Sequence, residues 1–110
     1  MIRKTVEKIE NTIQNIDSIN NNKKKELIQL LSTLKSEIEE LSKTQDEHAH
    51  SIAGFTEVAS HEATRSEKEV DLVNLAISGL SLSVKGMEIS HPALVKTVND
   101  LCNLLSSIGI

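Results

Sequence analysis

Residues 70–87 read VDLVNLAISGLSLSVKGM, and their apolar residues cover more of a helix than one face. A first stripe at helical spacing consists of Val70, Val73, Ile77, Leu80, Val84 and Met87. A second stripe at the same spacing consists of Leu72, Leu75, Gly79, Leu82 and Gly86. Burying one Leu or Ile contributes roughly 1.5–3 kcal/mol, so a helix that is apolar on two sides needs partners on two sides.

The second stripe is the predicted interface with another protein surface. Its glycines, Gly79 and Gly86, each cost about 1 kcal/mol relative to Ala inside a helix, so we expect them to let a neighbouring backbone approach. A chain of 110 residues has few other elements to cover this stripe. The sequence therefore predicts a homo-oligomer, with a dimer favoured.

A last helix is expected at 91–108, antiparallel to the helix at 70–88. Its core positions are Leu94, Val98, Leu101, Leu105 and Ile108. Gly109 follows the last apolar position and is expected to cap the helix.

The residues that join these two helices predict a hinge. Pro92 fits the first helical turn, where the N–H that it lacks would have no partner. His91 is then an N-terminal cap or hinge residue, with Glu88 about one turn away. A pH-sensitive contact between His91 and Glu88 is the alternative, because histidine titrates nearest to neutral pH.

Two short motifs occur in this C-terminal half, MEISHPAL at 87–94 and LSSIGI at 105–110. They resemble a family of small, uncharacterised bacterial proteins, a domain of unknown function, with a large apolar residue before Glu-x-x-His-Pro-x-Leu and a Leu-x-x-(Ile/Met)-Gly-Ile ending. The chain departs from that pattern in Met87, where Phe is expected, and in a longer middle segment. The N-terminal half shares only a Leu-rich helical pattern. The resemblance implies no activity and no site residues.

The N-terminal forty residues predict a helical hairpin. One narrow stripe, expected to define a helix at 2–19, consists of Ile2, Val6, Ile9, Ile13, Ile16 and Ile19. A second, expected to define a helix at 23–41, consists of Leu27, Leu31, Leu34, Ile38 and Leu41. Asn20, Asn21 and Asn22 favour a tight turn, since Asn caps helices and tolerates left-handed backbone. Helices joined so closely lie antiparallel.

The middle segment, 42–69, is polar and open to two interpretations. A weak stripe with one irregular step passes through Ile52 and Phe55, so 23–87 could form one long helix. Alternatively the helix breaks, with Gly54 as a weak point and capping boxes beginning at Thr64 and Ser66. We favour a break or a frayed, weakly packed stretch.

The composition indicates an all-α fold. The chain has one Pro and four Gly, too few for the many tight turns of an all-β protein. Its length fits a single domain, 1–110. We therefore predict an antiparallel helical bundle, or coiled-coil-like hairpins, with four amphipathic segments.

Charge, hydropathy and cysteine content restrict the partners and the compartment. A net charge of −4 argues against binding to nucleic acid, which requires a basic face. The most apolar run, 70–84, is shorter than the about 20 residues of a membrane span, and the N-terminus lacks the apolar core of a signal peptide. A lone cysteine, Cys102, fits a reducing, cytoplasmic compartment and a packed side chain.

The histidines and carboxylates of the middle segment suggest a metal site only weakly. Glu47 with His50, and Glu57 with His61, are spaced by about one helical turn, as in helical metal sites. The nearest members of the two pairs, His50 and Glu57, would lie about 10 Å apart along a helix. They would form two half-sites that a second chain must complete, so solvated side chains are the favoured interpretation.

The sequence thus predicts a non-enzymatic protein, without a cofactor, that self-associates as an interaction or scaffold module. It shows no glycine-rich phosphate loop and no arrangement typical of a nucleophile with its base. The first alternative is a regulatory binder of a different, unidentified protein. The second is a metal- or pH-responsive protein that uses His48, His50 and His61.

Overall fold

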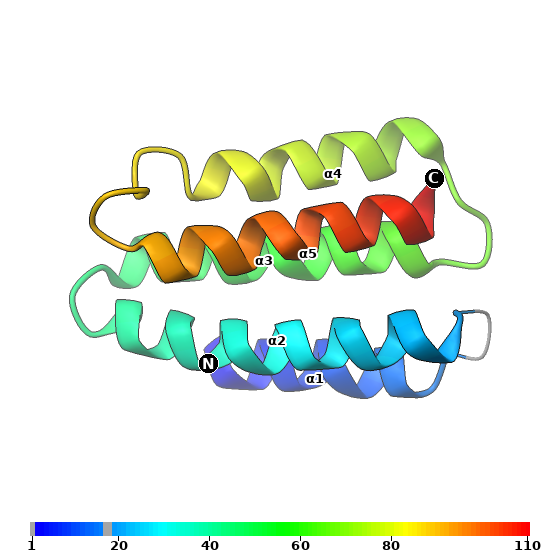
Figure 1. Ribbon diagram of the computed structural model, residues 1–110, viewed down its shortest axis with the longest axis horizontal. Coiled ribbons are helices and arrows are strands. Elements are labelled where there is room, and N and C mark those ends of the chain that lie inside the picture. Colours follow the sequence, from blue (N-terminus) through cyan, green and yellow to red (C-terminus); the bar gives the residue numbers. More distant parts are fainter. Residues whose placement is uncertain (1, 17–18) are drawn as a thin grey trace.

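The computed structural model describes residues 2–16 and 19–110, and within these ranges all regular elements are α-helices. They are α1 (Ile2–Gln14), α2 (Asn21–Ser42), α3 (Asp46–Thr64), α4 (Val70–Ser83) and α5 (Pro92–Gly109), as Figure 1 shows. The all-α prediction is confirmed, with five helices in place of the four expected segments. None of the described helices is both long and apolar enough to cross a membrane.

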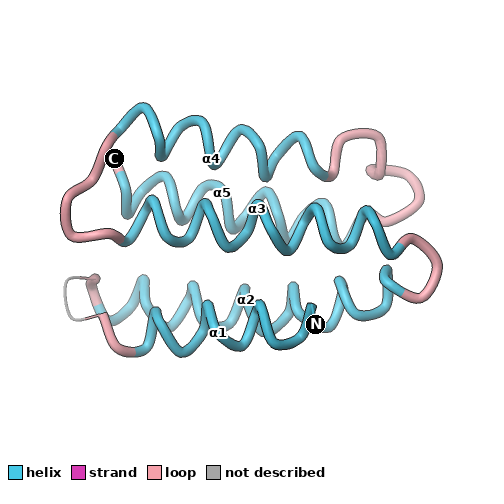
Figure 2. Tube along the Cα trace, turned by 180° about the vertical axis from the view of Figure 1, so that it is seen from behind, coloured by secondary structure: helices cyan, strands magenta, loops and turns pink. Residues whose placement is uncertain are grey.

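The helices form two layers, and consecutive helices run in opposite directions (Figures 1 and 2). One layer contains α1, α3 and α4, and the other contains α2 and α5. Helices α2 and α5 pack against each other; α2 also packs against α1 and α3, and α5 also packs against α3 and α4. Helix α3 therefore contacts all four other helices, while α1 and α4 lie at opposite edges and contact two helices each.

Of the two forms expected for the middle segment, a break or a frayed stretch, the structure has the breaks, and the segment between them forms the central helix α3. Its buried side chains are mostly small: Ala49, Ile52, Ala53, Thr56, Ala59, Ser60, Ala63 and Thr64. Acidic residues in its first turn, Asp46 and Glu47, complement the helix dipole. The break itself is confirmed, since 43–45 and 65–69 interrupt the helices and exclude the single long helix.

Helix α1 is shorter than the predicted 2–19 and ends at Gln14. Ile16 and Ile19 lie in the connection to α2, where Ile19 is buried. Residues 17 and 18, which belong to the predicted helix, lie outside the described residues. Asn20 caps α2 as predicted, because its Oδ1 accepts a hydrogen bond of 2.8 Å from the backbone N–H of Asn22.

The predicted core of the remaining helices is largely present. All five stripe positions of α2 are buried, and so are Leu94, Val98, Leu101 and Leu105 of α5. The first stripe of α4 is buried at Val73 and Leu80, and it continues past the end of the helix at Val84 and Met87. Val70 departs from the prediction, since it is exposed at the start of α4.

Gly109 does not cap α5 as predicted but lies buried inside its last turn. A Cβ at this position would lie 2.9 Å from Cγ1 of Val73 and 3.1 Å from the Cα of Ala63. Carbon atoms do not pack that closely, so only glycine lets α3, α4 and α5 meet at this end of the bundle.

We expect Gly109→Val to destabilise the protein by about 1–3 kcal/mol, the usual cost of overpacking a close helix contact. Gly54→Ala is the matched control, since a Cβ there meets nothing within 4 Å, and it should stabilise α3 by up to about 1 kcal/mol. Urea unfolding followed by circular dichroism measures both changes. Equal free energies of unfolding for the two variants would contradict the close contact.

Candidate functional site

Most of the large exposed apolar side chains of α3 and α4 gather on one surface, which we name the α3–α4 face. It consists of Phe55, Val58, Leu72, Leu75 and Leu82. Leu75 is 70% exposed and Leu82 is 63% exposed, so neither contributes much to the core of its own chain. Together with Glu62, Ala76, Ser78 and Gly79, these residues line an open groove of about 410 Å³.

The structure places three of the five predicted interface residues, Leu72, Leu75 and Leu82, on this face. Gly79 also lines the groove, but the space beside it is filled by the Phe55 ring of the same chain. A Cβ at Gly79 would lie 2.6 Å from Cε1 of Phe55. The expected approach of a neighbouring backbone at Gly79 is therefore replaced by an aromatic ring from α3.

Gly86 has a different role from the one predicted. It lies beyond the end of α4 and has a φ of +88°, a left-handed conformation that favours glycine. A Cβ at Gly86 would meet nothing within 4 Å. Gly86 therefore turns the chain after the helix, as glycines do at helix C-termini.

Two mostly uncharged helix surfaces border the groove. Helix α4 has Asp71 in its first turn, and the next charged residue along the chain is Lys85, beyond the helix end. The carboxylate nearest to the groove, Glu62, is paired with Arg65 at 2.9 Å. The α3–α4 face is thus an apolar surface whose charges lie at its two ends and its rim.

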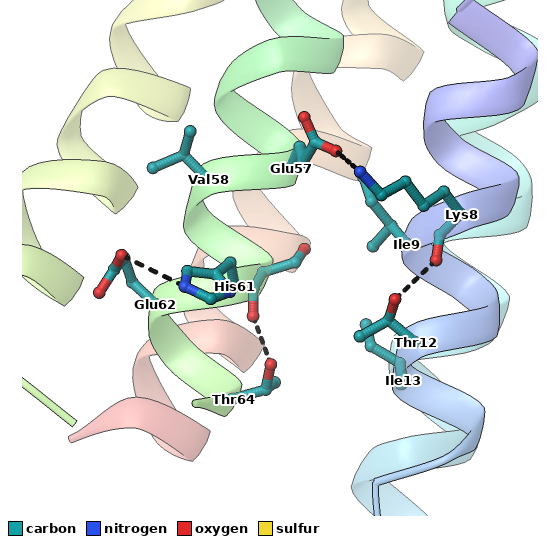
Figure 3. A pocket seen from close by; sticks show the side chains of 10 residues that line it. Lys8, Ile9, Thr12, Ile13, Glu57, Val58, His61, Glu62 and Thr64 are labelled. Carbon is teal, nitrogen blue, oxygen red and sulfur yellow. Dashed lines mark hydrogen bonds and ion pairs between the residues drawn. The ribbon is translucent and has the colours of Figure 1, made fainter. Parts of the chain in front are cut away.

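A second cavity, of about 420 Å³, opens between α1 and α3 on the other side of α3 (Figure 3). The buried side chains of Ile9 and Ile13 form its α1 wall. At its rim the ammonium of Lys8 lies 3.3 Å from Oε2 of Glu57, an ion pair that joins the two helices. Val58 lines both this cavity and the groove of the α3–α4 face.

The candidate metal residues form no common site. His50 Nδ1 lies 2.9 Å from the carbonyl oxygen of Asp46. His61 Nε2 lies 3.9 Å from Oε2 of Glu62, whereas Glu57 is paired with Lys8. Within 2–16 and 19–110, no three His, Cys, Asp or Glu residues are grouped so that they could hold a metal ion. Glu47 and His48 are exposed on the first turn of α3.

The hinge residues have the predicted backbone positions but not a Glu88–His91 contact. Pro92 is the first residue of α5, and His91 precedes it at the cap position without a side-chain cap bond. The Nδ1 of His91 lies 2.9 Å from Oγ of Ser90, while Glu88 is exposed. The connection is fixed by its backbone, because the N–H of His91 donates to the carbonyl of Met87 at 2.8 Å.

Cys102 is buried between α4 and α5, as a packed side chain is expected to be. Burial raises the pKa of its thiol to about 11. At neutral pH the thiol is therefore protonated and a poor nucleophile. Its Sγ lies 3.9 Å from the carbonyl oxygen of Ile77, a weak contact that suits a packing role.

Glu37 on α2 is a partly buried carboxyl group that the sequence analysis did not identify. Burial raises the pKa of Glu37, and a hydrogen bond with Thr97 of α5 lowers it by less. Its Oε1 is buried without a hydrogen-bond partner in the described part of the chain. The sequence feature that could have indicated its partial burial is its position next to Ile38, because residues that flank a core stripe are often half-covered by the neighbouring helix.

The comparisons with known proteins give no relative. No family model matches the chain, and neither a curated protein nor a solved structure matches it. The family resemblance of 87–94 and 105–110 stays a prediction, and the function has to be argued from the surfaces described above.

We expect Glu37→Gln to stabilise the protein at about pH 7.5 and to change its stability little at about pH 3.5. The folded protein holds the Glu37 proton more tightly than the unfolded chain does, because the folded pKa is raised above 4.5. The stability linked to this group therefore falls as the pH rises from the unfolded pKa through the folded one. Thermal unfolding at both pH values measures the difference.

Glu26→Gln, on the exposed side of α2, is the control and should show no such pH dependence. A Glu37→Gln variant that is less stable than the wild type at pH 7.5 would contradict this expectation, because it would show that the folded protein stabilises the charged Glu37 carboxylate.

Proposed function

We propose that this protein is a non-enzymatic interaction module in which two copies of the chain pair through the α3–α4 face. The observation that carries the proposal is the exposure of Leu75 and Leu82, at 70% and 63%, beside a groove with apolar walls. Contiguous apolar surface of this kind marks interaction sites in otherwise soluble domains. Removing such side chains from water contributes about 25 cal/mol for each Å² buried.

The charges of α4 favour a second copy as the partner. A two-fold axis near Ser78 would place the two α4 helices antiparallel, because most dimers are symmetric and use the same patch twice. Asp71 and Lys85 are equidistant from Ser78 in sequence, so each Asp71 would lie near the Lys85 of the other copy. In the same register Leu75 of one copy would pack near Leu82 of the other. Antiparallel helix dipoles add to this complementarity.

A different protein remains the alternative occupant, as an amphipathic helix could lie in the same groove. Binding of such a helix would not depend on Asp71 and Lys85 of α4 lying at equal distances from Ser78, whereas pairing of two copies would. The oligomeric state of the purified chain separates the two occupants.

We expect the purified chain to have twice its 12.1 kDa mass at about 100 μM in light scattering. Leu75→Glu should reduce the mass to one chain without unfolding it, since burying an unpaired charge in an interface costs several kcal/mol and Leu75 is not part of the core. Ile89→Glu is the matched control, because Ile89 is 96% exposed but lies away from the face. A wild-type mass of 12.1 kDa would refute self-association.

The antiparallel register predicts the outcome of a charge exchange. Asp71→Lys or Lys85→Asp alone should weaken the dimer by about 2- to 30-fold, because each dimer then loses two exposed ion pairs worth about 0.2–1 kcal/mol each. The double variant should recover most of the lost affinity, measured by sedimentation equilibrium. A double variant weaker than both single variants would contradict this register.

A further inference from the structure

The cavity between α1 and α3, which we name the α1–α3 cavity, has the size of a small-molecule site. Its volume of about 420 Å³ falls within the range of about 300–1,000 Å³ that such sites occupy. Ile9, Ile13 and Val58 provide apolar walls, and the other seven of the ten lining residues carry polar or charged side chains. It lies beside α3 on the side toward α1, and Val58 and Glu62 line both this cavity and the groove of the α3–α4 face.

One polar group in this cavity has no partner. Ser60 is 3% exposed, and its Oγ forms no hydrogen bond within the described residues. The other hydroxyl groups that line the cavity donate to carbonyls of their own helices: Thr12 to Lys8 at 2.9 Å, and Thr64 to Ser60 at 2.6 Å. A buried hydroxyl without a partner is rare in folded proteins, because it has lost its bonds to water. Ser60 therefore has an unused donor and acceptor in the wall of the cavity, and its Oγ, which has less than 1 Å² of accessible surface, reaches a ligand only after the side chain turns toward the open volume.

The charged groups around the cavity are already paired with one another. The ammonium of Lys8 faces the Glu57 carboxylate at 3.3 Å. The carboxylate of Glu62 faces the Arg65 guanidinium at 2.9 Å, and His61 Nε2 lies 3.9 Å from it. A charged ligand would have to disrupt one of these pairs to be neutralised, whereas an uncharged ligand would not.

From these observations we infer that the α1–α3 cavity binds a small, uncharged, mainly apolar molecule with one oxygen that hydrogen-bonds to Ser60. The apolar body of the ligand lies against Ile9 and Ile13, and its oxygen satisfies the buried hydroxyl. The inference is independent of the proposed self-association, since Leu75 and Leu82 do not line this cavity.

Four probes that share one ring test the inference: benzyl alcohol, toluene, benzylamine and benzoate. We expect benzyl alcohol to shift the methyl NMR signals of Ile9 and Ile13 saturably. Toluene, which lacks the oxygen, should bind about 2- to 10-fold more weakly, the factor that one net hydrogen bond supplies. Benzylamine and benzoate, which are charged at neutral pH, should bind at least about 10-fold more weakly than benzyl alcohol, because a charged group loses more hydration on burial.

Ser60→Ala should weaken benzyl alcohol binding by the same factor of about 2 to 10 and leave toluene binding unchanged. Ser51→Ala is the matched control, since Ser51 lies on the same helix but is exposed, and it should change neither affinity. The wild-type comparison of benzyl alcohol with toluene tests the role of the oxygen without any variant.

Three results would overturn the inference. The first is the absence of a saturable shift at Ile9 and Ile13, which would mean that the cavity holds only water. The second is a set of shifts confined to Leu72, Leu75 and Leu82, which would place the probe in the other groove. The third is equal affinity of benzyl alcohol for the wild type and for Ser60→Ala.

Discussion

The fold depends on the small side chains of α3, which allow one helix to contact four others. Ala49, Ala53, Ala59 and Ala63 are all buried, and each keeps the axis of α3 close to a neighbouring helix. Small residues supply little apolar area, so the larger side chains must come from the helices around α3. Helix α2 does this with five buried Leu or Ile residues in one stripe. At the centre of the bundle, small side chains therefore let the helices pack close to α3, while the helices around it supply most of the buried apolar area.

This arrangement places two hollows on the outer side of the layer that contains α1, α3 and α4. The exposed side of α3 presents Phe55 and Val58, and Val58 lines both hollows. The groove toward α4 is apolar, and none of the residues that line it has a buried hydroxyl without a hydrogen-bond partner. The cavity toward α1 contains the unpaired hydroxyl of Ser60 and a rim of paired charges. The two hollows thus differ in chemistry, and they suit a protein surface and a small ligand respectively.

Periodicity predicted those helices whose buried residues are large. The stripes of α2 and α5 were readable because Leu, Ile and Val contrast with the polar residues between them. Helix α3 was hard to predict because Ala, Ser and Thr give little such contrast, and because its largest apolar residue, Phe55, lies outside the core, 43% exposed and beside Gly79 of α4. Periodicity also assigned Gly79 and Gly86 one role, although Gly79 makes room for a ring and Gly86 turns the chain. The state of Ser60 depends on contacts between α1 and α3 and leaves no trace in the sequence.

A comparison of the two edge helices argues that the outward-facing leucines of α4 are not required by the fold. Helices α1 and α4 have equivalent positions, since each lies at an edge of the same layer and contacts two helices. Helix α1 packs against its two neighbours with one narrow buried stripe. Its outer side presents charged residues such as Lys4 and Glu7. Helix α4 buries a similar stripe and yet presents Leu75 and Leu82 outward. Because the described side chains of α1 fill the same position without outward apolar residues, the partner proposed above would explain those of α4.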